Sequence, residues 1–134
     1  MITLVDSNVI LDVVTNDPKW EAWSTEALSR TADESGLAIN PLIFAEVSVG
    51  FATIEELEEV LPLHEFERLE LPYEAAFLAG KAFLSYRRSG GSRSAPLADF
   101  YIGAHAAVAG LRLLTRDARR YRTYFPTVEL IAPE

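Results

Sequence analysis

Four acidic residues stand at places where folding could bring them together. Asp6 directly follows the apolar run at the N-terminus, and Asp117 comes three residues after Leu114, which ends a later apolar run. Glu46 and Asp99 each lie within an otherwise apolar stretch. A carboxylate among apolar neighbours is costly to bury unless it is paired, hydrogen-bonded or bound to a metal ion. We therefore treat these four side chains as candidates for one acidic site.

An acidic site of this kind needs a counter-charge, because like charges at short range cannot all stay ionised. The sequence has no cysteine and no paired-histidine motif, so the available ligands are oxygen atoms, which suit Mg²⁺ or Mn²⁺ better than Zn²⁺. Such an ion polarises a phosphoryl oxygen and lowers the pKa of a bound water, which can then attack a phosphodiester. The chemistry that these residues indicate is metal-dependent hydrolysis.

Each acid also has a structural interpretation. Asp6 could cap a helix that begins near Asn8, Asp99 could serve the first turn of its own helix, and Asp117 could cap the next one. Glu46 gains nothing from capping in the middle of a helix, but it could lie at the surface if its apolar neighbours are buried elsewhere. The catalytic interpretation requires the four side chains to converge.

The segments that must position these acids alternate between short apolar runs and helical stretches. Five runs are typical of buried β-strands: residues 2–5, 37–39, 66–69, 111–114 and 128–131. Helices separate most of them, an order that favours right-handed crossovers. We therefore predict an α/β fold with a mainly parallel sheet of about five short strands and helices on both faces. Sites in such sheets form beyond the carboxyl ends of the strands, where Asp6 and Asp117 are expected.

Helical segments are predicted at residues 20–30, 41–50, 73–87 and 95–109. Thr53 and Glu56 have the spacing of a capping box at the start of a further helix. Ser94 is the expected N-cap of the 95–109 helix. His105 lies six residues beyond Asp99, almost on the opposite face of that helix, so we expect it to pack in the interior rather than to bind metal.

The 134 residues are 49% hydrophobic and 24% charged, which is typical of one globular domain, expected to span residues 1–134. A chain of this length can bury a core without disulfide bonds or a structural metal. The first residues, MITLVDSNV, lack the basic start of a signal peptide, and no apolar run approaches the roughly 20 residues that cross a bilayer. We expect a cytoplasmic protein with no membrane partner.

The charge of the chain is unevenly distributed. The net charge of −8 argues, as a total, against a nucleic-acid partner. Residues 81–122, however, hold nine basic and two acidic residues, a local charge of +7, and the remainder carries −15. This region could face a polyanion such as RNA; the alternative is a set of solvated helix faces.

Four arginines in the basic region are candidates for contact with RNA. Arg87, Arg88 and Arg93 flank a serine- and glycine-rich connection and could bind phosphates, although a solvated surface explains them as well. Arg116 adjoins Asp117 and is the stronger candidate for stabilising charge at the transferred phosphate, unless its side chain points away.

The acids are carried by four sequence segments: LVDSNVILD, FAEV, PLADFYIGAHA and LLTRD. Together these segments resemble the PIN-domain ribonucleases, and within them the VapC-type toxins of bacterial VapBC toxin–antitoxin pairs. The resemblance runs from Ile2 to about Ile131. It rests on the order and spacing of the four acids rather than on any single motif.

The resemblance implies a catalytic and metal-binding pocket formed by four residues, Asp6, Glu46, Asp99 and Asp117. It implies that two polar residues support this pocket by hydrogen bonds or through water, Asn8 and Thr115. It further implies an α/β/α sandwich, endoribonuclease activity that depends on Mg²⁺ or Mn²⁺, inhibition by a cognate VapB-type antitoxin, and a homodimer. Single-stranded or looped RNA is the expected substrate, because an attacking water needs in-line access that a stacked duplex restricts.

Two other functions are compatible with an acidic α/β protein. A phosphate-receiver domain also binds Mg²⁺, but it needs a phosphorylatable aspartate at the end of a central strand and a late lysine, and the last lysine here is Lys81. A non-catalytic module could use the acids to attract a basic peptide. Saturable, carboxylate-dependent Mg²⁺ binding would distinguish a metal site from such a module.

Overall fold

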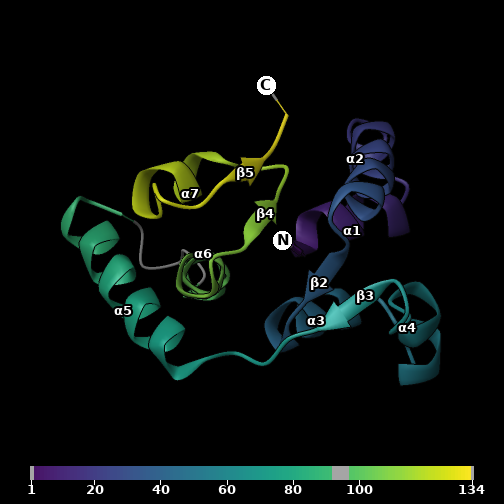
Figure 1. Ribbon diagram of the computed structural model, residues 1–134, viewed down its shortest axis with the longest axis horizontal. Coiled ribbons are helices and arrows are strands. Elements are labelled where there is room, and N and C mark those ends of the chain that lie inside the picture. The colour runs from purple at the N-terminus through teal and green to yellow at the C-terminus, as the bar shows by residue number, and fades with distance from the viewer. Residues whose placement is uncertain (1, 92–96, 134) are drawn as a thin grey trace.

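The computed structural model describes residues 2–91 and 97–133 and contains one parallel β-sheet. Its strands are β1 (Thr3–Val5), β2 (Leu37–Ile39), β3 (Phe66–Arg68), β4 (Arg112–Leu114) and β5 (Leu130–Ile131). They lie in the order β3-β2-β1-β4-β5, with β1 at the centre (Figure 1). All five predicted strands are confirmed, and each observed strand is no longer than the apolar run that predicted it.

Seven helices connect the strands in the described part of the chain. They are α1 (Ser7–Val14), α2 (Glu21–Glu34), α3 (Pro41–Ser48), α4 (Ile54–Val60), α5 (Tyr73–Arg88), α6 (Leu97–Ala109) and α7 (Arg119–Tyr124). Figure 1 shows α1 and α2 on one side of the sheet and α5 and α6 on the other. The α/β/α sandwich expected from the sequence is therefore confirmed. No described helix is long and apolar enough to cross a membrane.

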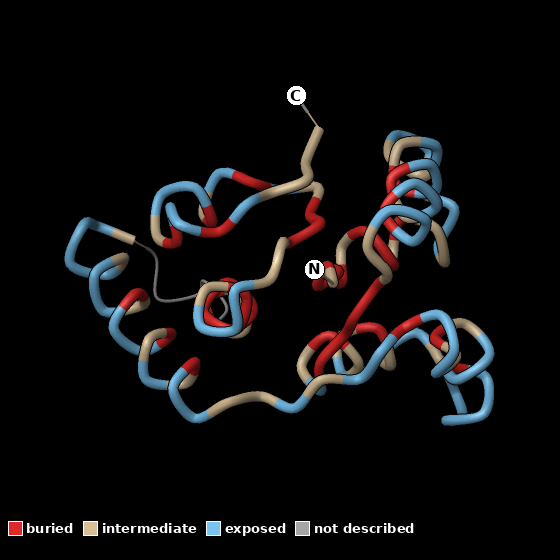
Figure 2. The backbone as a smooth tube through the Cα atoms, in the orientation of Figure 1, coloured by how far each residue is buried: buried red, intermediate tan, exposed pale blue. Residues whose placement is uncertain are grey.

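The core lies on both faces of the central strands. Figure 2 shows the strands at the centre as buried, and Leu4, Ile39 and Leu113 are at most 1% exposed. Phe100 of α6 is fully buried against one face. Because helices cover the sheet on both sides, every residue of β1 and β2 is buried, which explains why these strands are continuous apolar runs rather than alternating patterns.

The topology places three segments beside each other at the carboxyl edge of the sheet. The chain passes from β1 through β2 to β3 on one side, and then crosses back to β4 on the other side of β1. The segments that follow β1, β2 and β4 therefore begin at neighbouring positions with Asp6, Asn40 and Thr115. A change of direction in the strand order is the usual location of a site in an open α/β sheet.

Local signals in the sequence are matched by the observed contacts. Thr53 and Glu56 form the predicted capping box at the start of α4. Asn40 caps α3 by accepting a hydrogen bond from the amide of Ile43. Its side-chain nitrogen lies 3.0 Å from Nδ1 of His105, which is buried, so the prediction that this histidine packs in the interior is confirmed. The predicted cap at residue 94 lies outside the described residues.

Candidate functional site

Asp6 is the innermost acid of the site. Its backbone amide donates to the carbonyl of Leu114, which continues the pairing of β1 with β4. Its Oδ2 atom accepts hydrogen bonds from the hydroxyls of Thr115, at 2.9 Å, and Tyr121, at 2.8 Å. The residue is only 4% exposed. It occupies the N-cap position of α1 but makes no side-chain capping bond, so its carboxylate is directed to these two hydroxyls instead.

Burial dominates the electrostatics of Asp6. It raises the pKa of Asp6 from 3.8 to about 6, against the lowering effect of the hydrogen bonds from Tyr121 and Thr115. The charges of Asp99 and Glu46 contribute to this rise. Ionisation of Asp6 is therefore less favourable in the protein than in water, and a bound cation would stabilise the ionised form.

Asp99 and Asp117 line the same cavity as Asp6, with a volume of about 310 Å³. Asp99 lies in the first turn of α6, and burial raises its pKa, opposed by Arg120 and reinforced by Asp117. Asp117 is exposed in the loop between β4 and α7, where its amide donates to Oγ1 of Thr115 over 3.1 Å. The N-cap of α7 is Ala118, so a capping role for Asp117 is not observed.

Glu46 lies beside this cavity rather than in its lining. It is partly buried on α3, and its Oε1 accepts a hydrogen bond of 2.8 Å from the hydroxyl of Ser7. Burial raises the pKa of Glu46; the bond from Ser7 opposes this shift and the charge of Asp99 adds to it. The structure thus brings Asp6, Asp99 and Asp117 into one cavity and places Glu46 close enough to interact electrostatically with the first two.

Asn8 and Thr115 connect the end of β1 to the loop after β4. The side-chain nitrogen of Asn8 lies 3.4 Å from both Asp6 Oδ2 and Thr115 Oγ1, and its Oδ1 accepts from the amide of Arg116. Thr115 is fully buried and donates to Asp6. Both residues therefore hold the position of Asp6, and their part in metal binding stays a prediction.

Arg116 is directed away from the cavity, against Asp12 of α1. Its Nε and Nη2 atoms lie 2.8 Å and 3.0 Å from the two carboxylate oxygens of Asp12, and its guanidinium lies over the ring of Trp20. Asp12 is 2% exposed and also accepts a hydrogen bond from Ser24. In this structure Arg116 attaches the loop after β4 to α1, and it does not line the acidic cavity.

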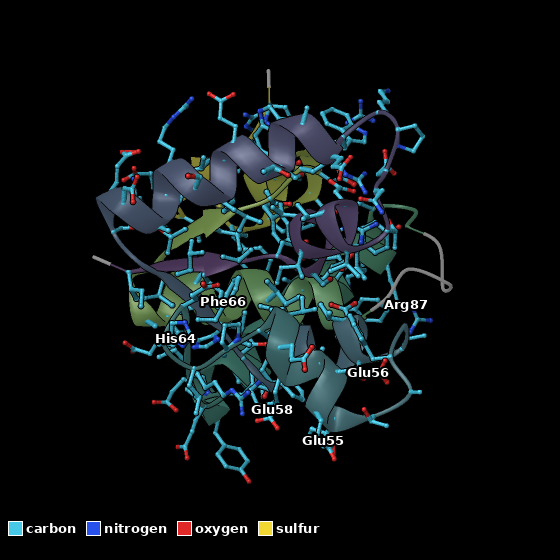
Figure 3. All side chains as sticks on the ribbon, turned by 90° about the vertical axis from the view of Figure 1, so that its right-hand side faces the viewer. Glu55, Glu56, Glu58, His64, Phe66 and Arg87 are labelled. Atoms are coloured by element: carbon cyan, nitrogen blue, oxygen red, sulfur yellow. The ribbon has the colours of Figure 1, made fainter. Side chains whose placement is uncertain are left out.

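The other predicted arginines do not line the acidic cavity among the described residues. Arg87 and Arg88 are exposed at the end of α5, and Arg87 lies at the surface in Figure 3. The residue at position 93 lies outside the described residues. Contact of these side chains with RNA stays a prediction.

Two residues of the site were not singled out by the sequence analysis, Arg120 and Tyr121. Arg120 lines the cavity and its Nη1 donates to Oδ2 of Asp99 over 2.8 Å. Tyr121 is buried and donates to Asp6. The sequence feature that could have identified them is their spacing: both lie about one helical turn after Asp117, and this places them near the same edge of the sheet. In the sequence both residues lie in an arginine-rich segment, where Arg120 is one of several positive charges and Tyr121 is not distinguished from its neighbours.

The oxygen atoms of this site fit a hard divalent cation in their chemistry. Within residues 2–91 and 97–133, however, no three aspartate, glutamate or histidine side chains are arranged to hold one ion together. Three of the acids are instead hydrogen-bonded to other side chains. Asp6 accepts from Thr115 and Tyr121. Asp99 accepts from Arg120, and Glu46 accepts from Ser7. Binding of an ion by several of these carboxylates requires some of the side chains to turn.

Comparison with known protein families decides between the candidate fold families. The PIN domain profile matches residues 3–126, a range that includes all four acids. The chain belongs to the PIN domain family. This PIN domain is therefore not a phosphate-receiver domain.

Solved structures share the same fold over almost the whole chain. One is VapBC2 from Rickettsia felis bound to a DNA fragment from its promoter, with a TM-score of 0.72, 19% identity and complete coverage of both chains. Another is VapBC-1 from nontypeable Haemophilus influenzae, with a TM-score of 0.71, 20% identity and 98% coverage of each chain. FitAcB from Neisseria gonorrhoeae has a TM-score of 0.71 and 21% identity, and the match covers 98% of this PIN domain and 96% of that chain. No curated protein sequence matches.

Proposed function

We propose that this PIN domain is an endoribonuclease that depends on Mg²⁺ or Mn²⁺. The observation that carries the proposal is the cavity at the carboxyl edge of the sheet, where Asp6, Asp99 and Asp117 meet with Glu46 beside them. Burial raises the pKa values of Asp6 and Asp99, and a divalent ion bound beside them would favour their ionised forms.

The side chains around the acidic cavity have different roles in the proposed reaction. Thr115 and Tyr121 fix one oxygen of Asp6, and Asn8 joins Asp6 to the loop that carries Asp117. Asp117 is exposed, so this side of the cavity is open to a phosphodiester. A divalent ion held by these carboxylates would supply charge neutralisation at the phosphoryl oxygen and a water of lowered pKa. A single-stranded or looped RNA presents the backbone that such a site can reach.

We also propose that the protein acts as the toxin of a toxin–antitoxin pair and forms a homodimer. The similar structures from R. felis and H. influenzae are VapBC complexes, and the same fold in this chain supports an analogous VapB-type antitoxin. The neighbouring reading frame offers a direct check, because a short gene with a DNA-binding start and a basic tail is expected there. Its absence would remove the toxin role and leave the nuclease activity open.

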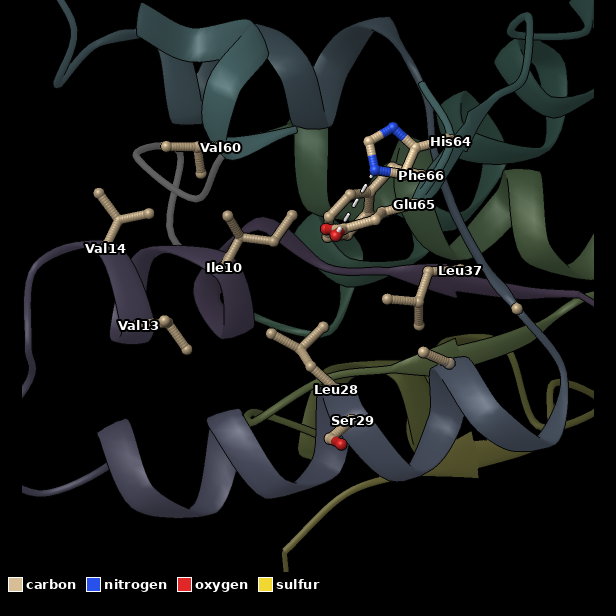
Figure 4. Close-up of a pocket in the computed structure, with 12 residues that line it drawn as sticks. Ile10, Val13, Val14, Leu28, Ser29, Leu37, Val60, His64, Glu65 and Phe66 are labelled. Carbon is tan, nitrogen blue, oxygen red and sulfur yellow. Dashed lines mark ion pairs between the residues drawn. The ribbon is translucent and has the colours of Figure 1, made fainter. Parts of the chain in front are cut away.

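An apolar hollow offers this antitoxin a surface distinct from the acidic cavity. It measures about 530 Å³ and is lined by Ile10, Leu28 and Phe66, among others, between α1, α2 and the start of β3 (Figure 4). The exposed side chains of Glu55, Glu56 and Glu58 on the neighbouring α4 make this side acidic (Figure 3). A basic segment with one apolar face would match both features. A Leu28→Glu variant, which introduces a charge into the apolar hollow, should lose binding to the antitoxin while retaining RNA cleavage.

Cleavage of RNA by the purified protein tests the nuclease proposal. We expect Mn²⁺ or Mg²⁺ to support cleavage, EDTA to stop it, and Asp6→Asn or Asp99→Asn to reduce the rate by about 100-fold or more, a loss typical of a group that stabilises the transition state. Asp33→Asn, an exposed change of the same kind on α2, should leave the rate unchanged. Equal activity of wild type, Asp6→Asn and Asp99→Asn would refute the proposal. Absence of saturable Mn²⁺ binding would favour a non-catalytic acidic module.

A further inference from the structure

Arg120 is fixed in the acidic cavity by three contacts. Its Nη1 donates to Oδ2 of Asp99 over 2.8 Å, and its guanidinium lies 5.2 Å from the ring centre of Tyr86 and 5.3 Å from that of Phe100. The side chain of Arg120 is 29% exposed and that of Asp99 is 35% exposed, so the pair lies at the wall of the cavity and not free in solvent. Contacts with two aromatic faces restrict where the guanidinium can move.

The neighbouring arginines are placed differently. Arg119 also lines the cavity but is exposed, and no ion pair links it to a described carboxylate. Arg116 is committed to Asp12 outside the cavity. Among the described residues, Arg120 is thus the cation that is paired directly with one of the four candidate acids. Its positive charge lowers the pKa of Asp99, against the stronger effect of burial.

A guanidinium at this position must compete with a divalent ion. The lone pair of Asp99 Oδ2 that accepts from Arg120 is not available to a metal ion, and two cations held by one carboxylate repel each other. Although three of the acids line this cavity, no three described carboxylates are arranged to hold one ion, which agrees with Arg120 taking the role of counter-charge at Asp99. Displacement of Arg120 is then part of the free energy of metal binding.

We propose that Arg120 is an internal counter-cation that leaves Asp99 when a divalent ion binds and then binds a phosphate of the RNA. This inference rests on the proposed metal-dependent nuclease function. A planar guanidinium suits both partners, because carboxylate and phosphate each accept two parallel hydrogen bonds from it. Its contacts with Tyr86 and Phe100 keep the released group at the cavity wall, beside the place where the substrate must lie. Metal and RNA are thereby coupled through one side chain.

The two roles of Arg120 predict opposite effects of its removal. Arg120→Gln should bind Mn²⁺ about tenfold more tightly than the wild type, within the range of ordinary coupling between two sites. At saturating Mn²⁺ it should cleave RNA with a KM raised about tenfold, because the variant lacks one charge-assisted contact with a phosphate. A purely structural role would instead weaken both metal binding and catalysis.

Arg119→Gln is the matched control, because it removes the same charge from the same cavity without breaking an ion pair among the described residues. Calorimetric titration with Mn²⁺ should show it to differ from wild type by less than about threefold, as expected for a solvated charge. If Arg120→Gln does not fold, Arg120→Met decides, since it removes the charge and keeps a long side chain to pack against Tyr86 and Phe100. It should bind Mn²⁺ more tightly than the wild type and also raise the KM.

The outcomes separate this inference from the nuclease proposal. If the wild type binds Mn²⁺ and Asp99→Asn abolishes binding, but Arg120→Gln matches Arg119→Gln or binds more weakly than the wild type, the inference on Arg120 falls and the proposed function stands. If Arg120→Met, used in place of an unfolded Arg120→Gln, binds Mn²⁺ no more tightly than the wild type, the inference also falls. If the wild type neither binds Mn²⁺ nor cleaves RNA, both are overturned.

Discussion

The hydroxyl of Tyr121 donates a 2.8 Å hydrogen bond to Asp6, joining helix α7 near the end of the chain to the residue that follows β1. Both residues are buried. Burial and the negative charge of Asp6 together raise the pKa of Tyr121 well above its ordinary value, so this hydroxyl keeps its proton and remains a donor. Tyr121 therefore fixes the orientation of the most buried acid in the site.

Replacement of Tyr121 by phenylalanine should destabilise the protein by about 1–2 kcal/mol, because it leaves a buried carboxylate with one donor fewer. It should also raise the pKa of Asp6 further, since the lost hydrogen bond favours the ionised form. Urea unfolding measures the first effect. Thr25→Val is the control, because Thr25 is exposed on α2 and loss of its hydroxyl should alter stability by only a few tenths of a kcal/mol. Equal stability of the two variants would contradict this role of Tyr121.

The raised pKa of Asp6 predicts a pH dependence of stability in the absence of metal. The folded-state value of about 6 lies above the ordinary 3.8, so the contribution of neutral Asp6 to stability is fully present below pH 3.8 and is lost as the pH rises through 6. The loss amounts to about 3 kcal/mol by pH 7.5.

Asp6→Asn isolates this effect, because asparagine stays neutral while the other acids remain. In EDTA, the stability of Asp6→Asn relative to wild type should increase between pH 4 and pH 7.5, as measured by chemical unfolding at each pH. Addition of Mn²⁺ should stabilise the wild type and not the variant. A stability difference that does not change with pH would show that Asp6 ionises as it does in water.

The bidentate pair between Asp12 and Arg116 should stabilise the loop that carries Asp117. Because Asp12 is buried and Arg116 is partly exposed, Asp12→Asn should cost about 1.5–3 kcal/mol, the range for a hydrogen bond to a charged group. A double-mutant cycle with Arg116→Met measures the interaction itself. A coupling free energy near zero would mean that the two side chains are placed independently.

The proposed homodimer can be tested on α5. Tyr73 and Phe77, four residues apart on one face of this helix, are 90% and 69% exposed, and Leu84 lies two turns further along. An exposed apolar face of this kind is typical of an interface between copies of a chain. Phe77→Glu should convert a dimer to a monomer in light scattering after gel filtration. Leu63→Glu, at a similarly exposed apolar residue outside α5, should leave the dimer intact.

The sheet and the positions of the acids were predictable because they depend on patterns that lie along the chain. Apolar runs separated by helical segments predict parallel strands, and parallel strands bring Asp6 and Asp117 to one edge. Glu46 was harder to place, because a helix can carry the residue to the right edge and still direct its side chain to Ser7 beside the cavity.

The partners of the arginines could not be predicted in the same way. Arg116, Arg119 and Arg120 are almost adjacent in the sequence, yet Arg116 binds Asp12, Arg120 binds Asp99 and Arg119 is exposed. Arg116 lies in the loop after β4, whereas Arg119 and Arg120 begin α7, so the difference between these two depends on the direction in which α7 leaves the loop. That direction is determined by tertiary packing, such as the burial of Tyr121, rather than by the charge of the segment.

The central position of β1 has a consequence for the synthesis of the protein. Asp6 leaves the ribosome well before Thr115 and Tyr121, which follow it by 109 and 115 residues, and β4 must pair with β1 before they meet. A partly synthesised chain therefore lacks an assembled site. For an enzyme proposed to cut RNA, this order of emergence protects the message from which the chain is being read.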